Sequence, residues 1–533
     1  MSYSVILCVI LSLFSTGVMS YVSMATPIGP WIAPTVALLA LILFKFSRYR
    51  SSHNTSIALV TAGASVGGIV ATALGFSFPA IYFSDPHTFA QWTASPFTFS
   101  CLVACLVLAG GGLGLLCAQM LEAPLLDRQK LPFPIGEMVY KLIQASDSVG
   151  KAYQLIFGAL LTCAMYAAQI ITYRGAPLIA RSYALTSTVS VGAWALPALL
   201  FDVSPFVWAI GFVTGHLIAL PLAVGALSKI IIIDPLSKLA FTELSYSEFI
   251  LAFCSGMIVV STVLGFSKPI RRLYYLMRTR KVPSFDGNKM MRILTSHTIG
   301  PEHVLILSAI LVLFSYFQMA WYVQIYTIVL TVVMTYQLLL IAGRIGLAPL
   351  GRFATFVMIP ALFLFKLDTV QLIIIATFVE LCGGVAADIL FGQRLARLSG
   401  ISSDRVRMFQ WIGLCISAFA AGIFLYVLVT NFQLGSSVLC VQKAYARHLM
   451  LAATTFNYAV LGCGMIFGLI LTYVNINPAL VLGGILMPLP LSLGLIVGAL
   501  IAWICPDYER YIPFWSGVFA ISSLWMILSA LCF

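Results

Sequence analysis

Apolar runs recur along almost the whole chain, separated by short polar or charged stretches. A run of roughly 20 apolar residues is long enough to cross the hydrocarbon layer of a membrane as a helix. The pattern therefore predicts an all-α integral membrane protein with about 16 transmembrane helices. The expected spans are residues 4–22, 30–46, 56–83, 100–122, 152–172, 186–203, 206–230, 246–267, 302–319, 321–340, 351–366, 369–391, 408–430, 448–474, 479–504 and 513–532.

The distribution of basic residues agrees with this count. With the N-terminus in the cytoplasm, most of the 29 Lys and Arg residues fall in cytoplasmic loops, and the others, including Lys443 and Arg447, fall on the outer side. Such a bias is typical of membrane proteins. The cytoplasmic loops that carry it are 45–50, 128–151, 268–292, 344–352 and 394–407. We expect a multi-pass protein of the plasma membrane (the cell's inner membrane) with both termini in the cytoplasm.

The most basic loop divides the expected spans into two groups of eight. The first half, the basic cytoplasmic linker and the second half are residues 1–267, 268–301 and 302–533. Residues 204–227 also align with 477–500, so that Pro205 matches Pro478. Repeats with an even number of spans have the same orientation in the membrane. We therefore expect two parallel eight-helix repeats.

Composition excludes several classes of protein. Hydrophobic residues make up 61% of the 533 residues and charged residues only 9%, too few to cover a soluble surface. This excludes a soluble enzyme and a nucleic-acid-binding domain, and the net charge of +12 is assigned to the cytoplasmic loops. The common hydrolase, metalloprotease and nucleotide-binding motifs are absent from the sequence. We expect no enzyme activity, no cofactor and no metal site, and a lipid bilayer as the surroundings.

Two aligned segments contain the residues that interrupt helices. Pro221 lies in the first, and Gly484, Pro488 and Pro490 lie in the second. A proline removes a backbone donor and leaves a carbonyl without its helical partner. Interrupted spans at matching positions of two halves indicate a transport site, although each proline can also be a simple kink. We expect Gly484, Pro488 and Pro490 to bind substrate.

Ionisable residues within apolar runs are the second indication of transport. Glu380 and Asp388 lie close together around one face of an expected helix, Asp202 lies in another span, and Glu137 follows an unusual loop. A carboxyl group in an apolar environment can carry a proton, as a proton-coupled carrier requires. His216 is a candidate relay. Alternatives stay open: Asp388 can mark a helix end, and His216 can be a hydrogen-bonded core residue.

Other polar side chains in the expected spans either line a path or hold helices together. We include them as candidate substrate-binding residues, and they are Gln119, Tyr166, Gln169, Asn457 and Tyr458.

Two motifs are the most distinctive features of the sequence. A glycine-rich span ending in Gly110, Gly111, Gly112 and Gly114 is followed by Lys130 and the turn LPFP-I-G at 131–136. The prolines exclude regular helix there, and a short helix is expected over 137–145. Near the C-terminus, NP at 477–478 leads through GGI to LMPLP at 486–490.

These motifs and the layout of spans resemble the oligopeptide transporter family, which includes the yellow-stripe-like carriers. The resemblance implies a cation-coupled symporter, usually driven by protons, for small oligopeptides or related peptide-like solutes. The NPG and KIPPR motifs of the eukaryotic peptide carriers are absent. A symporter of metal chelates of the siderophore or nicotianamine type is therefore an alternative. A channel and a membrane-embedded enzyme are further alternatives from other classes.

Overall fold

A computed structural model describes most of the chain. The described residues are 2–25, 31–46, 53–145, 149–173, 176–184, 189–191, 194–196, 200–214, 216–241, 301–345, 348–436, 438–451, 457–474, 489–505, 510–515 and single or paired positions within 244–260, 476–485, 507–508 and 517–525. The expected linker at 268–301 lies outside the described residues except for Pro301.

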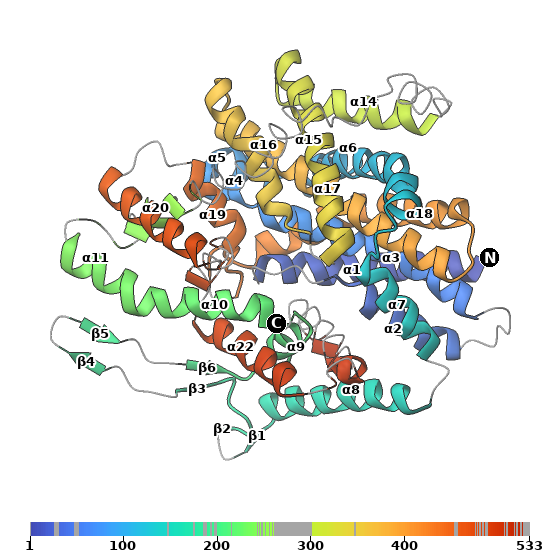
Figure 1. The fold of residues 1–533 in the computed structure, drawn as a ribbon, viewed down its shortest axis with the longest axis horizontal. Helices are drawn as coiled ribbons and strands as arrows, with labels where there is room; N and C mark the ends of the chain where they lie inside the picture. Colours follow the sequence, from blue (N-terminus) through green and yellow to red (C-terminus); the bar gives the residue numbers. More distant parts are fainter. Residues whose placement is uncertain are drawn as a thin grey trace.

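A bundle of long helices forms the centre of the molecule (Figure 1). Its members are α1 (Ser2–Ala25), α2 (Ala33–Phe46), α3 (His53–Ser77), α6 (Pro96–Glu122), α15 (Trp321–Ile345), α16 (Leu350–Leu364), α17 (Thr369–Leu398) and α18 (Ser403–Asn431). Helix α17 packs against α3, α6, α15 and α16, and α14 (Pro301–Tyr316) covers α6. Because neighbours surround α17, its side chains from Leu372 to Gln393 are buried.

A second group of helices lies beside this bundle, at the left and in the lower part of Figure 1. Its members are α8 (Val149–Ile170), α9 (Pro205–Thr214), α10 (His216–Ser228), the π-helix η2 (Lys229–Ile233), α11 (Asp234–Ala240), α20 (Tyr458–Tyr473) and α22 (Leu489–Ile504). Helix α22 packs against both α9 and α10. The two segments aligned in the sequence analysis are therefore partly in contact with each other.

Short elements connect the long helices. They are α4 (Ala80–Ser84), α5 (Pro86–Thr93), the π-helix η1 (Ala123–Arg128), α7 (Pro134–Ala145) and α19 (Gln442–Leu451). The short helix expected after the LPFP turn is confirmed as α7, which begins at the second proline of the turn. Proline suits the first turn of a helix because the backbone N–H that it lacks would have no helical acceptor there.

The expected span at 186–203 is wrong, because the described residues of this stretch form strands. Strand β3 (Ser182–Ala184) pairs with β6 (Leu200–Asp202), and β4 (Val189–Val191) pairs with β5 (Trp194–Leu196), both antiparallel. Strands β1 (Thr172–Tyr173) and β2 (Ala176–Pro177) form a third pair. Serine, threonine and valine dominate 186–191: threonine and valine favour strands, and serine is a weak helix former. The fold is thus mostly, but not entirely, α-helical.

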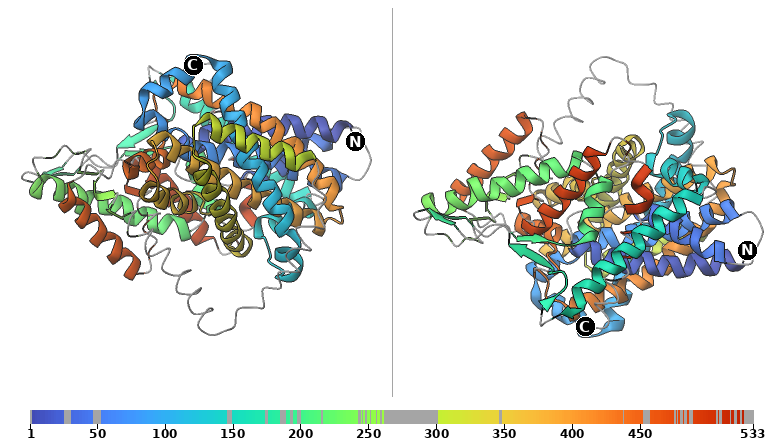
Figure 2. Two further views of the ribbon diagram at one scale, coloured as in Figure 1. Left: turned by 90° about the horizontal axis from the view of Figure 1, so that it is seen from above. Right: turned by 90° about the horizontal axis from the view of Figure 1, so that it is seen from below.

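The strands lie at the edge of the molecule. In Figure 1 and in both views of Figure 2, the β4–β5 hairpin and the N-terminus are at opposite ends. The hairpin is therefore remote from the bundle around α17.

Six helices of the described part are long and apolar enough to cross a membrane. Their ranges are Tyr3–Ala25, Asn54–Ser84, Pro96–Arg128, Trp321–Gly343, Thr369–Leu398 and Ser403–Asn431. Further apolar helices are shorter, and the expected spans 206–230 and 448–474 are each divided between two helices. A multi-pass helical membrane protein is confirmed, whereas sixteen spans and two repeats stay predictions.

Candidate functional site

Helix α17 carries both acids that the sequence singled out in its apolar interior. Glu380 and Asp388 are buried, and eight residues separate them, which places them about 12 Å apart along the helix axis. The glycine-rich middle of α6 lets the two helices approach closely: a Cβ on Gly114 would lie 2.3 Å from the carbonyl oxygen of Cys382. This contact holds α17 deep inside the bundle.

Glu380 lies in a buried polar cluster made by three other helices. The Ser77 hydroxyl, at the end of α3, donates to Oε2 of Glu380. Arg447 of α19 donates from Nη2 to Oε1 of Glu380 at 2.7 Å and also reaches the Gly351 carbonyl of α16 at 3.4 Å. A buried carboxylate and a buried guanidinium compensate each other's loss of hydration. We call Ser77, Glu380, Lys443 and Arg447 the Glu380 cluster.

Asp388 has different surroundings. The Ser65 hydroxyl of α3 donates to Oδ2 of Asp388 at 2.8 Å, and no cation forms an ion pair with Asp388 among the described residues. A cavity of about 10 Å³ adjoins the carboxylate and is also lined by Thr61 and Gly136. The Thr61 hydroxyl is buried without a hydrogen-bond partner in the described structure. The cavity is at the lower size limit for one water molecule, and its lining is mostly apolar.

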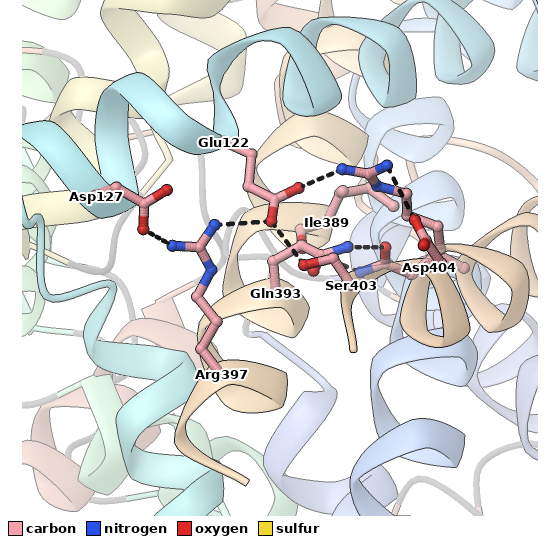
Figure 3. Close-up of polar contacts among 9 residues, drawn as sticks. Glu122, Asp127, Ile389, Gln393, Arg397, Ser403 and Asp404 are labelled. Carbon is pink, nitrogen blue, oxygen red and sulfur yellow. Dashed lines mark hydrogen bonds and ion pairs between the residues drawn. The ribbon is translucent and has the colours of Figure 1, made fainter. Parts of the chain in front are cut away.

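A third cluster joins the ends of α6, α17 and α18 (Figure 3). Glu122 accepts hydrogen bonds from Arg397 at 2.8 Å, Arg407 at 2.9 Å and the Ser403 hydroxyl at 3.0 Å. Arg397 also pairs with Asp127, and Arg407 pairs with Asp404. The loops at 128–151 and 394–407 therefore meet at one end of the bundle, as their shared basic character predicts. We call this group the Glu122 cluster.

Glu137 lies near this same end, on α7. It forms an ion pair with Arg394 of α17, and both side chains are partly exposed. The turn that precedes it is anchored inside the protein: Phe133 is fully buried, its N–H donates to the Gly343 carbonyl at 2.9 Å, and its ring packs edge-on against Phe391. The LPFP turn thus positions α7 beside the cavity at Asp388.

In the described part of the chain, the interrupted segments pack mainly on each other rather than on the Glu380 helix. Gly211 of α9 packs directly on the Leu495 backbone of α22, where an added Cβ would lie 2.2 Å from the carbonyl oxygen. Gly225 of α10 similarly contacts the backbone around Gly484. The helices that pack against α17 are instead α3, α6, α15 and α16. We expected the interrupted segments and the Glu380 helix to line one cavity. The described residues do not form such a cavity.

Three residues that the sequence predicts to act in transport belong to this region. One has a local structural role, and the structure does not describe the side chains of the other two. Pro490 is the second residue of α22, where proline fits without breaking the helix. Pro488 lies outside the described residues. His216 begins α10, and its side chain is not among those described.

Tyr166, Gln169 and Asp202 gather in the second group of helices. The Tyr166 ring stacks on Trp525 with centroids 5.5 Å apart, and the Gln169 amide donates to the Val203 carbonyl at 2.8 Å. Asp202 is half-buried on β6, and its pKa is raised by burial, although the nearby Arg181 opposes this. These contacts tie α8 to the strand region and to the helix segment that contains Trp525.

The other predicted polar residues do not gather around α17. Asn457 caps α20 by accepting from the Ala459 N–H at 3.0 Å, and Tyr458 is mostly exposed. Gln119 is partly buried on α6. Asn457 is thus a helix cap rather than a bundle residue.

The sequence analysis missed the partners of the two acids. Ser65 and Ser77 carry no charge and look like ordinary polar residues of an apolar helix. Lys443 and Arg447 were expected in an outer loop, but Arg447 is buried on α19. Their four-residue spacing, which puts them on one helix face, was the available signal.

The described residues contain no group of three or more His, Cys, Asp or Glu side chains that could hold a metal ion. A comparison with curated proteins found no match. Residues 2–267, about half of the chain, match the family model described as OPT oligopeptide transporter protein. The match begins in α1 and covers the glycine-rich helix α6 and the LPFP turn that place α17. The chain therefore belongs to the oligopeptide transporter family.

Proposed function

We propose that this protein is a secondary active transporter that carries small oligopeptides, or related peptide-like solutes, together with protons. The observation that carries the proposal is the pair of buried carboxyl groups on α17, Glu380 and Asp388, each with a serine hydroxyl of α3 as donor. Ionisable residues are costly within a membrane bundle and are found where ions or substrates pass.

Asp388 is the proton carrier in this proposal. A carboxylate without a paired cation is expensive to bury, whereas the neutral acid is not. A conformation that buries Asp388 therefore favours its protonation. A conformation that opens the adjoining cavity to water favours release of the proton. Glu380 is a weaker candidate because Arg447 compensates its charge. Glu137, paired with Arg394 near the cavity, can relay protons between Asp388 and water.

Uptake into liposomes tests this assignment. Purified protein is reconstituted and an inward proton gradient is imposed, with radiolabelled tetra-alanine outside. We expect Asp388→Asn to reduce gradient-driven accumulation by at least about tenfold, because the step that couples a proton to the solute is lost, which is worth at least about 1.4 kcal/mol. Exchange of tetra-alanine across the membrane without a gradient should remain.

The matched control is Asp368→Asn, which makes the same carboxyl-to-amide change at the exposed N-terminus of the same helix. It should accumulate tetra-alanine as the natural protein does. Normal accumulation by Asp388→Asn would show that another group couples the proton. If a protonophore leaves uptake by the natural protein unchanged, proton symport itself is wrong. Substituting a ferric nicotianamine complex for tetra-alanine tests the metal-chelate alternative in the same assay.

A further inference from the structure

The short helix α19 places two cationic side chains next to a single buried acid. Lys443 and Arg447 are one helical turn apart. Arg447 is only 6% exposed and pairs with Glu380, and the Lys443 ammonium lies 3.2 Å from the centre of the Phe76 ring. No second carboxylate pairs with either cation among the described residues. The cluster therefore holds two basic side chains and one acid in a region largely shielded from water.

The hydrogen-bonding capacity of this cluster is only partly used. Arg447 Nη2 donates to Glu380 and to the Gly351 carbonyl, but its Nε and Nη1 are buried without an acceptor in the described structure. Gln442, next to Lys443 and 5% exposed, has neither an acceptor for its amide nitrogen nor a donor for its amide oxygen there. Buried polar groups of folded proteins are nearly always hydrogen-bonded, so these free donors indicate a ligand.

The chemistry of the free groups indicates an anion with more than one acceptor oxygen. Guanidinium donors make their strongest hydrogen bonds to carboxylates. A carboxylate can accept from Nη1 of Arg447 while Glu380 keeps Nη2, and the Lys443 ammonium one helical turn away can support it. Such a ligand would also add a second acid beside the two basic side chains.

We infer that Arg447, with Lys443, binds a free carboxylate of the transported solute. This rests on the proposed transport function and narrows it, because the carried solutes then share a free carboxylate. Glu380 and the solute carboxylate compete for the Arg447 guanidinium. The binding site is thus on the Glu380 cluster, whereas the proton carrier Asp388 is two helical turns further along α17.

Two probes that differ only in the carboxylate test the inference. Tetra-alanine and its C-terminal amide are compared by thermal stabilisation of the full-length protein in detergent, which reports binding without transport. We expect the free acid to bind at least about tenfold more tightly than the amide, because only the free acid can accept a charge-assisted hydrogen bond from Arg447. Equal stabilisation by both probes, or by neither, overturns the carboxylate site.

Variants separate recognition from a purely structural ion pair. Glu380→Gln removes the rival carboxylate and should tighten binding of the free acid while leaving the amide unchanged. The double variant Glu380→Gln with Arg447→Gln contains no unpaired buried charge from this pair and should bind the two probes alike. A structural Arg447 would instead shift both probes equally in every variant.

The control is Arg405→Gln, which removes an exposed arginine of α18 and should keep the preference for the free acid.

The experiments distinguish failure of this inference from failure of the proposed function. If the probes bind alike while a proton gradient still drives uptake, only the carboxylate site is wrong. If the free acid is preferred but no gradient drives its uptake, the site stands and proton-coupled transport is wrong.

Discussion

Glu122 shows how one buried side chain can hold several segments together. Its two carboxylate oxygens accept from Arg397, Arg407 and Ser403, which come from α17 and α18. The carboxylate is 5% exposed, so water contributes little to its solvation. Asp404 pairs with the same Arg407 but is almost fully exposed. The two acids thus share a partner and differ in burial.

Glu122→Gln should destabilise the protein by about 1.5–3 kcal/mol, because two arginines, each of which keeps a second acid, lose their charged acceptor in the interior. Asp404→Asn should change stability by less than about 1 kcal/mol, as expected of an exposed ion pair. Thermal unfolding in detergent measures both. Equal effects of the two substitutions would mean that Glu122 contributes no more than a surface charge.

Glycines set the separation between neighbouring helices of the bundle. Gly63 of α3 and Gly413 of α18 face each other, and a Cβ on Gly413 would lie 2.0 Å from the Gly63 carbonyl oxygen. Small residues at such crossings let backbones approach within contact distance in membrane proteins. Since α3 carries Ser65 and Ser77, this crossing also helps to place the donors for the acids of α17.

Gly413→Ala should destabilise the protein by about 1–3 kcal/mol or more, because the backbones of α3 and α18 must separate to admit the methyl group. Gly462→Ala is the matched control: Gly462 lies within α20 and has no atom within 4 Å of an added Cβ. It should be neutral or slightly stabilising, since alanine favours helix more than glycine does. Comparable losses in both variants would contradict the role of the crossing.

Across the whole molecule, α3 and α17 run antiparallel, because Ser65 meets Asp388 and Ser77 meets Glu380. The Glu122 cluster then lies at one end of the bundle, and α4, α5 and α19 lie toward the other. The charge bias of the loops predicts that the Glu122 end faces the cytoplasm.

Cysteine labelling tests this orientation. Cysteines introduced at the exposed positions Lys130 and Arg405 should react with a membrane-impermeant maleimide only when the membrane is opened. A cysteine at the exposed Gln91 should react in intact cells, because α5 lies at the opposite end. The natural cysteines provide the background measured in parallel. The reverse labelling pattern would invert the topology.

The membrane class and many helices could be predicted from the residues alone. Whether a stretch of 20 residues enters a bilayer depends on its own hydrophobicity, so α1, α6, α17 and α18 were evident. Glu380 and Asp388 were evident for the same reason, since an acid in such a stretch is rare. The strands at 182–202 were missed because the apolar content was weighed without the strand preference of Thr and Val.

The partners of these acids depend on how distant segments pack. Ser65 and Ser77 reach Asp388 and Glu380 from the other end of the chain, and Arg447 arrives on a short helix that hydrophobicity does not identify. Close backbone contacts at glycines determine which helices are neighbours. These pairings cannot be predicted from a single sequence. Local solvation thus explains which segments enter the membrane, while close packing explains which charges meet there.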